Sequence, residues 1–139
     1  MITRPQVGDR HSISFTVTPA KTVPALYPES PDFTAMPQVF ATGFMVGLME
    51  WACVDALKPH LEPGEGSLGI AVDVTHTAAT LPGQTVTVRV ECIESEGNRL
   101  GWTVSAHDGI DAIGEGTHRR AVVKWDKFNA RMEEKRKKL

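Results

Sequence analysis

The segment of residues 40–57 constrains the fold most, because it predicts a helix of about five turns with apolar residues on every face. Only Glu50 and Asp55 in this segment are charged. A helix of this kind must be enclosed rather than laid on a surface. Pro59 and the turn at residues 63–66 are expected to end it.

Five other segments predict strands, and four of them follow the helix with tight turns between them. The predicted strands are residues 12–17, 67–76, 85–94, 99–108 and 112–124. Short connections between consecutive strands imply antiparallel pairing. A strongly curved antiparallel sheet wrapped around one central helix is therefore the expected α+β architecture. The remaining face of the helix would be covered either by a second copy of the chain or by a loop of the same chain.

That loop is the stretch 19–38, which carries five prolines among scattered apolar side chains. The prolines make a regular helix or a central strand improbable. A loop this long is usually either a functional lid or disordered, and its aromatic residues favour a packed lid. Residues 126–139 predict a C-terminal helix whose basic last turn, 135–138, is best explained as solvated.

Composition narrows the class of protein. The 139 residues are 41% hydrophobic with a net charge of −2, which predicts one domain over residues 1–139 and disfavours nucleic acid or an anionic membrane surface as partner. No stretch resembles a signal peptide or a membrane span, so we expect a cytoplasmic protein. Cys53 and Cys92 lie in apolar segments and are expected to be reduced and buried. No motif for a metal or a nucleotide cofactor is present, so no cofactor is expected.

Glu50 is the most informative candidate for chemistry. An ionised carboxylate among apolar neighbours carries a large desolvation cost, so it is either paired or poised to react. The alternative is that it escapes to solvent, but Asp55 lies about 140° away around the helix and shares no polar strip with it. Thr42 lies eight residues earlier, too far for a direct hydrogen bond to Glu50, and capping the helix is the commonest role for such a threonine.

Three further residues have two interpretations each. His76 follows a predicted strand and has the chemistry of a general base near neutral pH, although a solvated histidine is the commoner case. Gly69 within a strand indicates either a bulge or the close approach of a ligand. Arg120 has the charge to bind an anionic group, although an exposed strand arginine is more frequent.

Long contiguous runs resemble the fluoroacetyl-CoA thioesterase family of the hot-dog superfamily. The runs are residues 39–54, 61–69, 74–79 and 116–120, with shorter ones at 21–23, 26–31, 105–109 and 127–130. The resemblance implies a hot-dog fold, in which a curved antiparallel sheet wraps one long helix, paired as a homodimer. It also implies a hydrolase that converts fluoroacetyl-CoA to fluoroacetate and CoA and so confers fluoroacetate resistance.

The resemblance also implies the site. Thr42, Glu50 and His76 occupy the positions of the family's catalytic threonine, glutamate and histidine. Gly69 and Arg120 would line the acyl-thioester site. The residues of the implied hydrophobic lid over the acyl group are Val23, Leu26, Phe33 and Met36.

Position 36 departs from the family, which has phenylalanine where this chain has Met36. Methionine is longer and more adaptable than an aromatic ring, so the acyl pocket should differ in shape. Two alternatives to a fluorine-selective enzyme follow. One is a general short-chain acyl-CoA thioesterase, and the other is a non-catalytic hot-dog protein that binds acyl-CoA.

Overall fold

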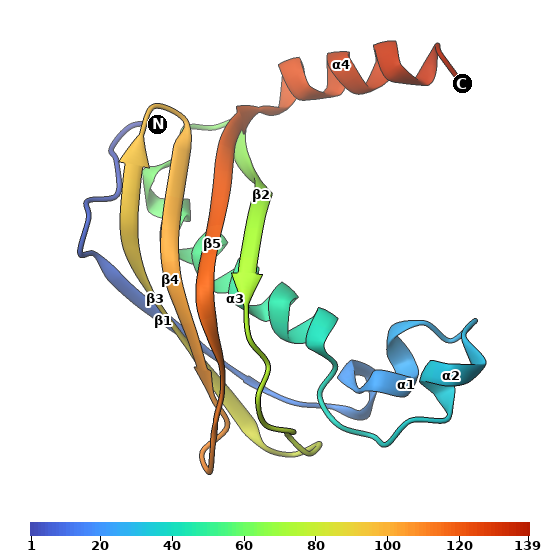
Figure 1. Cartoon of the computed structure of the whole chain (residues 1–139). Coiled ribbons are helices and arrows are strands. Elements are labelled where there is room, and N and C mark those ends of the chain that lie inside the picture. Colours follow the sequence, from blue (N-terminus) through green and yellow to red (C-terminus); the bar gives the residue numbers. More distant parts are fainter.

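The computed structural model describes residues 1–139 and contains one antiparallel sheet that curves around one long helix (Figure 1). The five strands lie in the order β1-β3-β4-β5-β2. Their bounds are β1 Arg10–Thr16, β2 Glu65–Val74, β3 Thr85–Glu96, β4 Arg99–His107 and β5 Ala112–Lys124. The predicted α+β class, with a curved antiparallel sheet around a central helix, is confirmed.

Helix α3, Thr42–Leu57, lies against the concave face of the sheet. Met45, Met49 and Cys53 are buried there and join the core formed with the sheet. The opposite side of the helix is not covered by this chain, since 55% of Trp51 and 38% of Val54 are exposed. The enclosure expected from the sequence is thus only partly supplied by one chain.

The stretch 19–38 is more regular than expected. It forms a short 3₁₀ helix, η1 Pro19–Lys21, and two helices of four residues each, α1 Val23–Leu26 and α2 Pro31–Thr34. Each has a proline in its first two positions, where the missing N–H has no intrahelical partner to lose. The prolines therefore start short helices here, and the expectation of an irregular loop was wrong in that respect.

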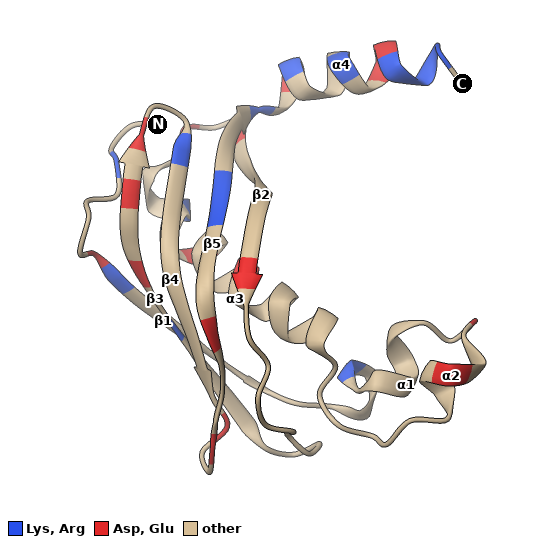
Figure 2. Ribbon diagram, viewed as in Figure 1, with Lys and Arg blue, Asp and Glu red and all other residues tan.

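Helix α4, Trp125–Arg136, follows β5 directly and projects away from the sheet (Figure 1). It has no buried residue and carries charges of both signs along its length (Figure 2). Trp125 contacts the body in two ways: its indole lies over Gly66 of β2, where an added Cβ would be 2.0 Å from the ring, and its N–H donates to the Gly64 carbonyl at 3.0 Å. None of the helices is long and apolar enough to cross a membrane.

Strand β2 is an edge of the sheet, paired only with β5. Its register shifts between Gly69 and Ala71, which confirms the predicted bulge. Ile70 and Val72 are apolar but about half exposed. An exposed edge with apolar side chains is a template for pairing with another strand.

Candidate active site

Glu50 of α3 is held by Arg120 of β5. The Arg120 Nη1 donates to Glu50 Oε2 at 3.2 Å, and Arg120 is buried while 42% of the Glu50 side chain is exposed. Gly69 of β2, the cross-strand partner of Arg120, makes room for this pair. A Cβ at Gly69 would lie 3.4 Å from Glu50 Oε2 and 3.5 Å from Arg120 Nη1. The structure therefore brings three of the predicted site residues together.

The expectation that Arg120 is more often an exposed strand residue does not hold, because this arginine is buried. Ser67 and His118, which the sequence analysis did not single out, complete its surroundings. Arg120 donates from Nε to Ser67 Oγ at 2.8 Å and from Nη1 to His118 Nε2 at 3.1 Å. A signal was available: residues two apart on a strand share a face, so His118 and Arg120 lie on the same face as buried Val122.

Thr42 and His76 form a second cluster. The Thr42 hydroxyl and His76 Nδ1 are 2.7 Å apart and hydrogen-bonded. Thr42 is the first helical residue of α3 and caps nothing, because the extended Ala41 takes the N-cap position. The capping role preferred from the sequence is therefore wrong, and the hydroxyl is free to bind the histidine.

His76 lies just beyond the end of β2, and its backbone is fixed from both sides. Thr75 N–H donates to the Glu115 carbonyl at 2.9 Å, and Thr77 N–H donates to the Ile113 carbonyl at 2.7 Å. Its Nε2 atom is buried and has no hydrogen-bond partner. Burial lowers the pKa of His76 below its usual value, because the charged form loses solvation. A neutral imidazole with one unsatisfied nitrogen is suited to exchange a proton with an arriving group.

The two clusters do not meet within one chain. Thr42 and Glu50 are eight residues apart in one helix, which places them about 12 Å apart along its axis. The structure thus contains two separate clusters, one with a carboxylate and a guanidinium, the other with a hydroxyl and an imidazole.

One of the four predicted lid residues, Leu26, contacts the first turn of α3. Leu26 covers that turn, since a Cβ at Gly43 would be 3.2 Å from Leu26 Cδ1. The Phe33 ring stacks on Tyr27 with centroids 5.9 Å apart. Val23 is half-buried and its N–H donates to the Val39 carbonyl. Met36 is 46% exposed.

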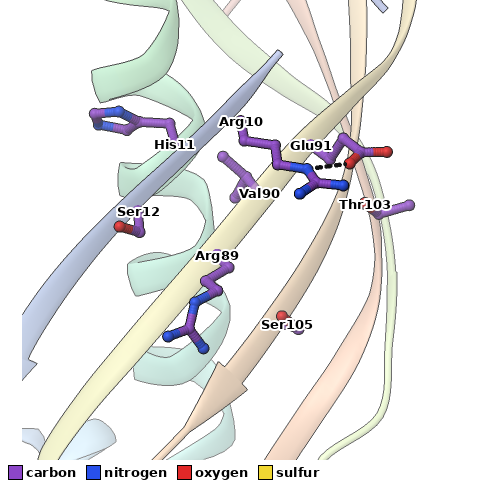
Figure 3. A pocket seen from close by; sticks show the side chains of 8 residues that line it. All are labelled: Arg10, His11, Ser12, Arg89, Val90, Glu91, Thr103 and Ser105. Carbon is purple, nitrogen blue, oxygen red and sulfur yellow. Dashed lines mark hydrogen bonds and ion pairs between the residues drawn. The ribbon is translucent and has the colours of Figure 1, made fainter. Parts of the chain in front are cut away.

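Two hollows lie elsewhere on the chain. One is apolar, between β1 and α3, with Phe15, Phe44 and Trp51 in its lining. The other is a polar groove across β1, β3 and β4, where Arg10 donates to Glu91 at 2.7 Å (Figure 3). Neither contains a predicted catalytic residue. No three His, Cys, Asp or Glu side chains lie close enough together to hold a metal ion.

Comparison with known proteins assigns the family. Residues 17–126 match the family model described as fluoroacetyl-CoA-specific thioesterase. The fluoroacetyl-CoA thioesterase of Streptantibioticus cattleyicolor is 65% identical over 130 residues, which are 94% of each chain. A solved structure of the fluoroacetyl-CoA thioesterase FlK is 65% identical with a TM-score of 0.92, over 94% of this chain and 96% of that one.

A more distant solved structure, a hot-dog-like protein from Thermanaerovibrio acidaminovorans, has a TM-score of 0.80 at 25% identity, over 94% of this chain and 93% of that one. The predicted hot-dog fold is therefore confirmed. Because the family model spans most of its length, the chain belongs to the fluoroacetyl-CoA-specific thioesterase family.

Proposed function

We propose that this chain is a thioester hydrolase that converts fluoroacetyl-CoA and water to fluoroacetate and CoA. The observation that carries the proposal is Glu50, a partly exposed carboxylate on an apolar helix. One of its two oxygens, Oε2, is held by the buried Arg120. The 65% identity to a named fluoroacetyl-CoA thioesterase supports the same substrate. A purely binding protein has no need of a carboxylate in this position.

Glu50 is the group that acts on the thioester. Its Oε2 accepts from Arg120, and its Oε1 accepts no hydrogen bond from the protein. Oε1 either attacks the carbonyl carbon, forming an acyl anhydride and expelling CoA thiolate, or takes a proton from the attacking water. In both routes the C–S bond breaks and the oxygen of water ends in the carboxylic acid.

Thr42 and His76 handle the proton and the substrate. The Thr42 hydroxyl fixes the imidazole through Nδ1, and Nε2 is left to give a proton to the departing thiolate or to remove one from the acyl group. Gly69, without a side chain, lets the thioester approach the Glu50–Arg120 pair. The proposed lid, which reaches the first turn of α3 through Leu26, would exclude water from the acyl group.

A complete site requires a second copy of the chain, and we propose a homodimer. The two clusters, each of which would be a half-site, lie about 12 Å apart along α3, so Thr42 and His76 of one copy would meet Glu50 of the other. Two features support pairing along β2: its free edge and the half-exposed Ile70 and Val72. A two-fold dimer of this kind would contain two equivalent sites.

Glu50→Gln tests the chemistry. We expect kcat for CoA release from fluoroacetyl-CoA to fall at least about 10³-fold, because the amide neither attacks nor accepts a proton. Asp55→Asn is the matched control: it is on the same helix, pairs with His11 instead of Arg120, and should keep full activity. Near-native turnover by folded Glu50→Gln enzyme would refute the assignment.

Mixing two inactive variants tests the shared site. Thr42→Ala and Glu50→Gln dimers, unfolded and refolded together in equal amounts, should form half heterodimers, each with one intact site. About a quarter of wild-type activity should therefore return. If the site lay within one chain, the mixture would stay as inactive as its components.

Selectivity and cellular role form the rest of the proposal. The second candidate function is a general short-chain thioesterase without fluorine selectivity. Met36 is the observation that favours it, because methionine shapes the acyl pocket differently from phenylalanine. The ratio of kcat/KM for fluoroacetyl-CoA to that for acetyl-CoA and propionyl-CoA decides between them. Action in the cytoplasm and fluoroacetate resistance follow from the proposed substrate. Growth of a sensitive host in the presence of fluoroacetate, producing either the wild-type chain or the Glu50→Gln variant, tests resistance. Cell fractionation tests the cytoplasmic location.

A further inference from the structure

We propose that His118 and Ser67 are positioning residues that clamp the Arg120 guanidinium from two sides and so aim one N–H of Nη1 at Glu50. The inference rests on the proposed function, because it assigns these residues a role in orienting the reacting carboxylate. Neither residue reaches the half-site of Thr42 and His76.

The tautomer of His118 follows from its partners. Its Nδ1 is 2.8 Å from the Ala71 carbonyl, which only accepts, so Nδ1 carries the hydrogen. Its Nε2 is 3.1 Å from Arg120 Nη1, which only donates, so Nε2 must be the bare nitrogen. The ring is buried, with 2% exposed. The structure therefore requires a neutral imidazole that accepts a hydrogen bond from the arginine.

The donors of Arg120 are assigned one by one. Ser67 takes one edge of the guanidinium: its Oγ accepts from Nε at 2.8 Å and its carbonyl accepts from Nη2 at 2.9 Å. The two hydrogens of Nη1 go to His118 Nε2 at 3.1 Å and to Glu50 Oε2 at 3.2 Å. With the plane held by Ser67 and one Nη1 hydrogen held by His118, the other can point only toward Glu50.

Protonation of His118 would break the clamp. A hydrogen on Nε2 would face the N–H of Arg120, and a second cation would stand beside the first. The charged or titratable groups around the ring are Arg120 on its own strand, Glu50 on α3 and, beside these two, Cys53 on α3. Burial, and then the Arg120 charge, lower the pKa of His118 below its usual value against the opposing effects of Ala71 and Glu50. The ring thus stays neutral near pH 7.

Two substitutions separate positioning from simple filling of space. In His118→Gln the amide oxygen can stand where Nε2 stood, so kcat should stay within about threefold of wild type. His118→Leu fills similar space without an acceptor, and kcat should fall about 10²-fold with KM little changed, because the carboxylate is misplaced. Ser67→Ala keeps the carbonyl acceptor and should lose less.

The pH profile supplies a readout that packing alone would not move. Plots of log kcat/KM against pH should show one acid-side ionisation fewer in His118→Gln than in wild type. His107→Gln, at an exposed histidine outside both half-sites, is the control and should keep the wild-type profile.

The outcomes distinguish this inference from the proposed function. If Glu50→Gln is inactive but His118→Leu keeps wild-type kcat, only the positioning role is overturned. If His118→Leu does not fold, an unchanged acid limb in His118→Gln overturns it instead. If Glu50→Gln itself retains turnover, the proposed function has failed first.

Discussion

The geometry around Glu50 depends on the absence of a side chain at Gly69 as well as on the charge of Arg120. Gly69 faces the point where Arg120 Nη1 and Glu50 Oε2 meet, and any Cβ there would stand in the approach to the carboxylate. Sequence alone left Gly69 open between a bulge and a ligand contact. The structure confirms the bulge, which falls between Gly69 and Ala71, and the ligand contact stays a prediction.

Methionine at position 36 should broaden the choice of acyl group. Met36→Phe is expected to raise the ratio of kcat/KM for fluoroacetyl-CoA to that for acetyl-CoA, because a flat ring shapes the acyl pocket more rigidly than a flexible chain. Measuring both substrates on one preparation gives the ratio directly. An unchanged ratio would remove position 36 from the explanation of selectivity.

Burial of His76 and His118 makes stability depend on pH. Both have a pKa below their usual value, so in acid the unfolded chain binds protons that the folded chain does not. Their contribution should be fully present above about pH 6.5 and be lost progressively as pH falls below it. Urea unfolding at several pH values measures this, and His118→Gln should show a shallower dependence. An identical dependence in the variant would contradict this account.

At the scale of elements, the sequence predicted the pieces better than their contacts. The strand predicted over residues 112–124 has the observed bounds of β5. The prediction of an irregular loop over residues 19–38 is wrong, because proline breaks a helix interior but also begins helices. The Thr42–His76 contact joins residues 34 positions apart, which no local pattern encodes.

Gly66→Ala should detach α4 from the sheet. The added Cβ would stand 2.0 Å from the Trp125 ring, so the indole must move, at a cost of about 1–3 kcal/mol in the free energy of unfolding. Urea unfolding measures the loss. In the Trp125→Ala background the same glycine substitution should cost much less, and equal costs in both backgrounds would show that the indole contact is unimportant.

At the scale of the whole molecule, one chain forms an open arch. The sheet forms its back, α4 projects from one end and the α1–α2 segment from the other, and α3 lies between them (Figure 1). Val54 on the uncovered side of α3 is 38% exposed, and β2 leaves one edge of the sheet free. The sequence indicates that one helix face needs further cover, by the lid or by a second chain, and the 19–38 stretch contacts α3 at its first turn through Leu26.

Val72→Lys tests that edge. A charge in the middle of the proposed β2–β2 contact should convert the proposed dimer to monomers and, because each proposed shared site then lacks half its residues, abolish activity. Sedimentation velocity and CoA release should change together. Ile110→Lys, in the exposed turn before β5, is the matched control and should leave both unchanged. A monomeric variant with full activity would show that one chain suffices.

Because both cysteines are buried, the folded protein should not react with the thiol reagents that detect released CoA. Burial raises the pKa of Cys53 to about 12 and raises that of Cys92 as well, so neither is a thiolate near neutral pH. A chromogenic disulfide reagent added to the folded enzyme should therefore react only with the thiol of released CoA. Once the chain unfolds, two thiols per molecule become reactive. One reagent can thus follow turnover in the native protein and count the molecules that have lost their fold.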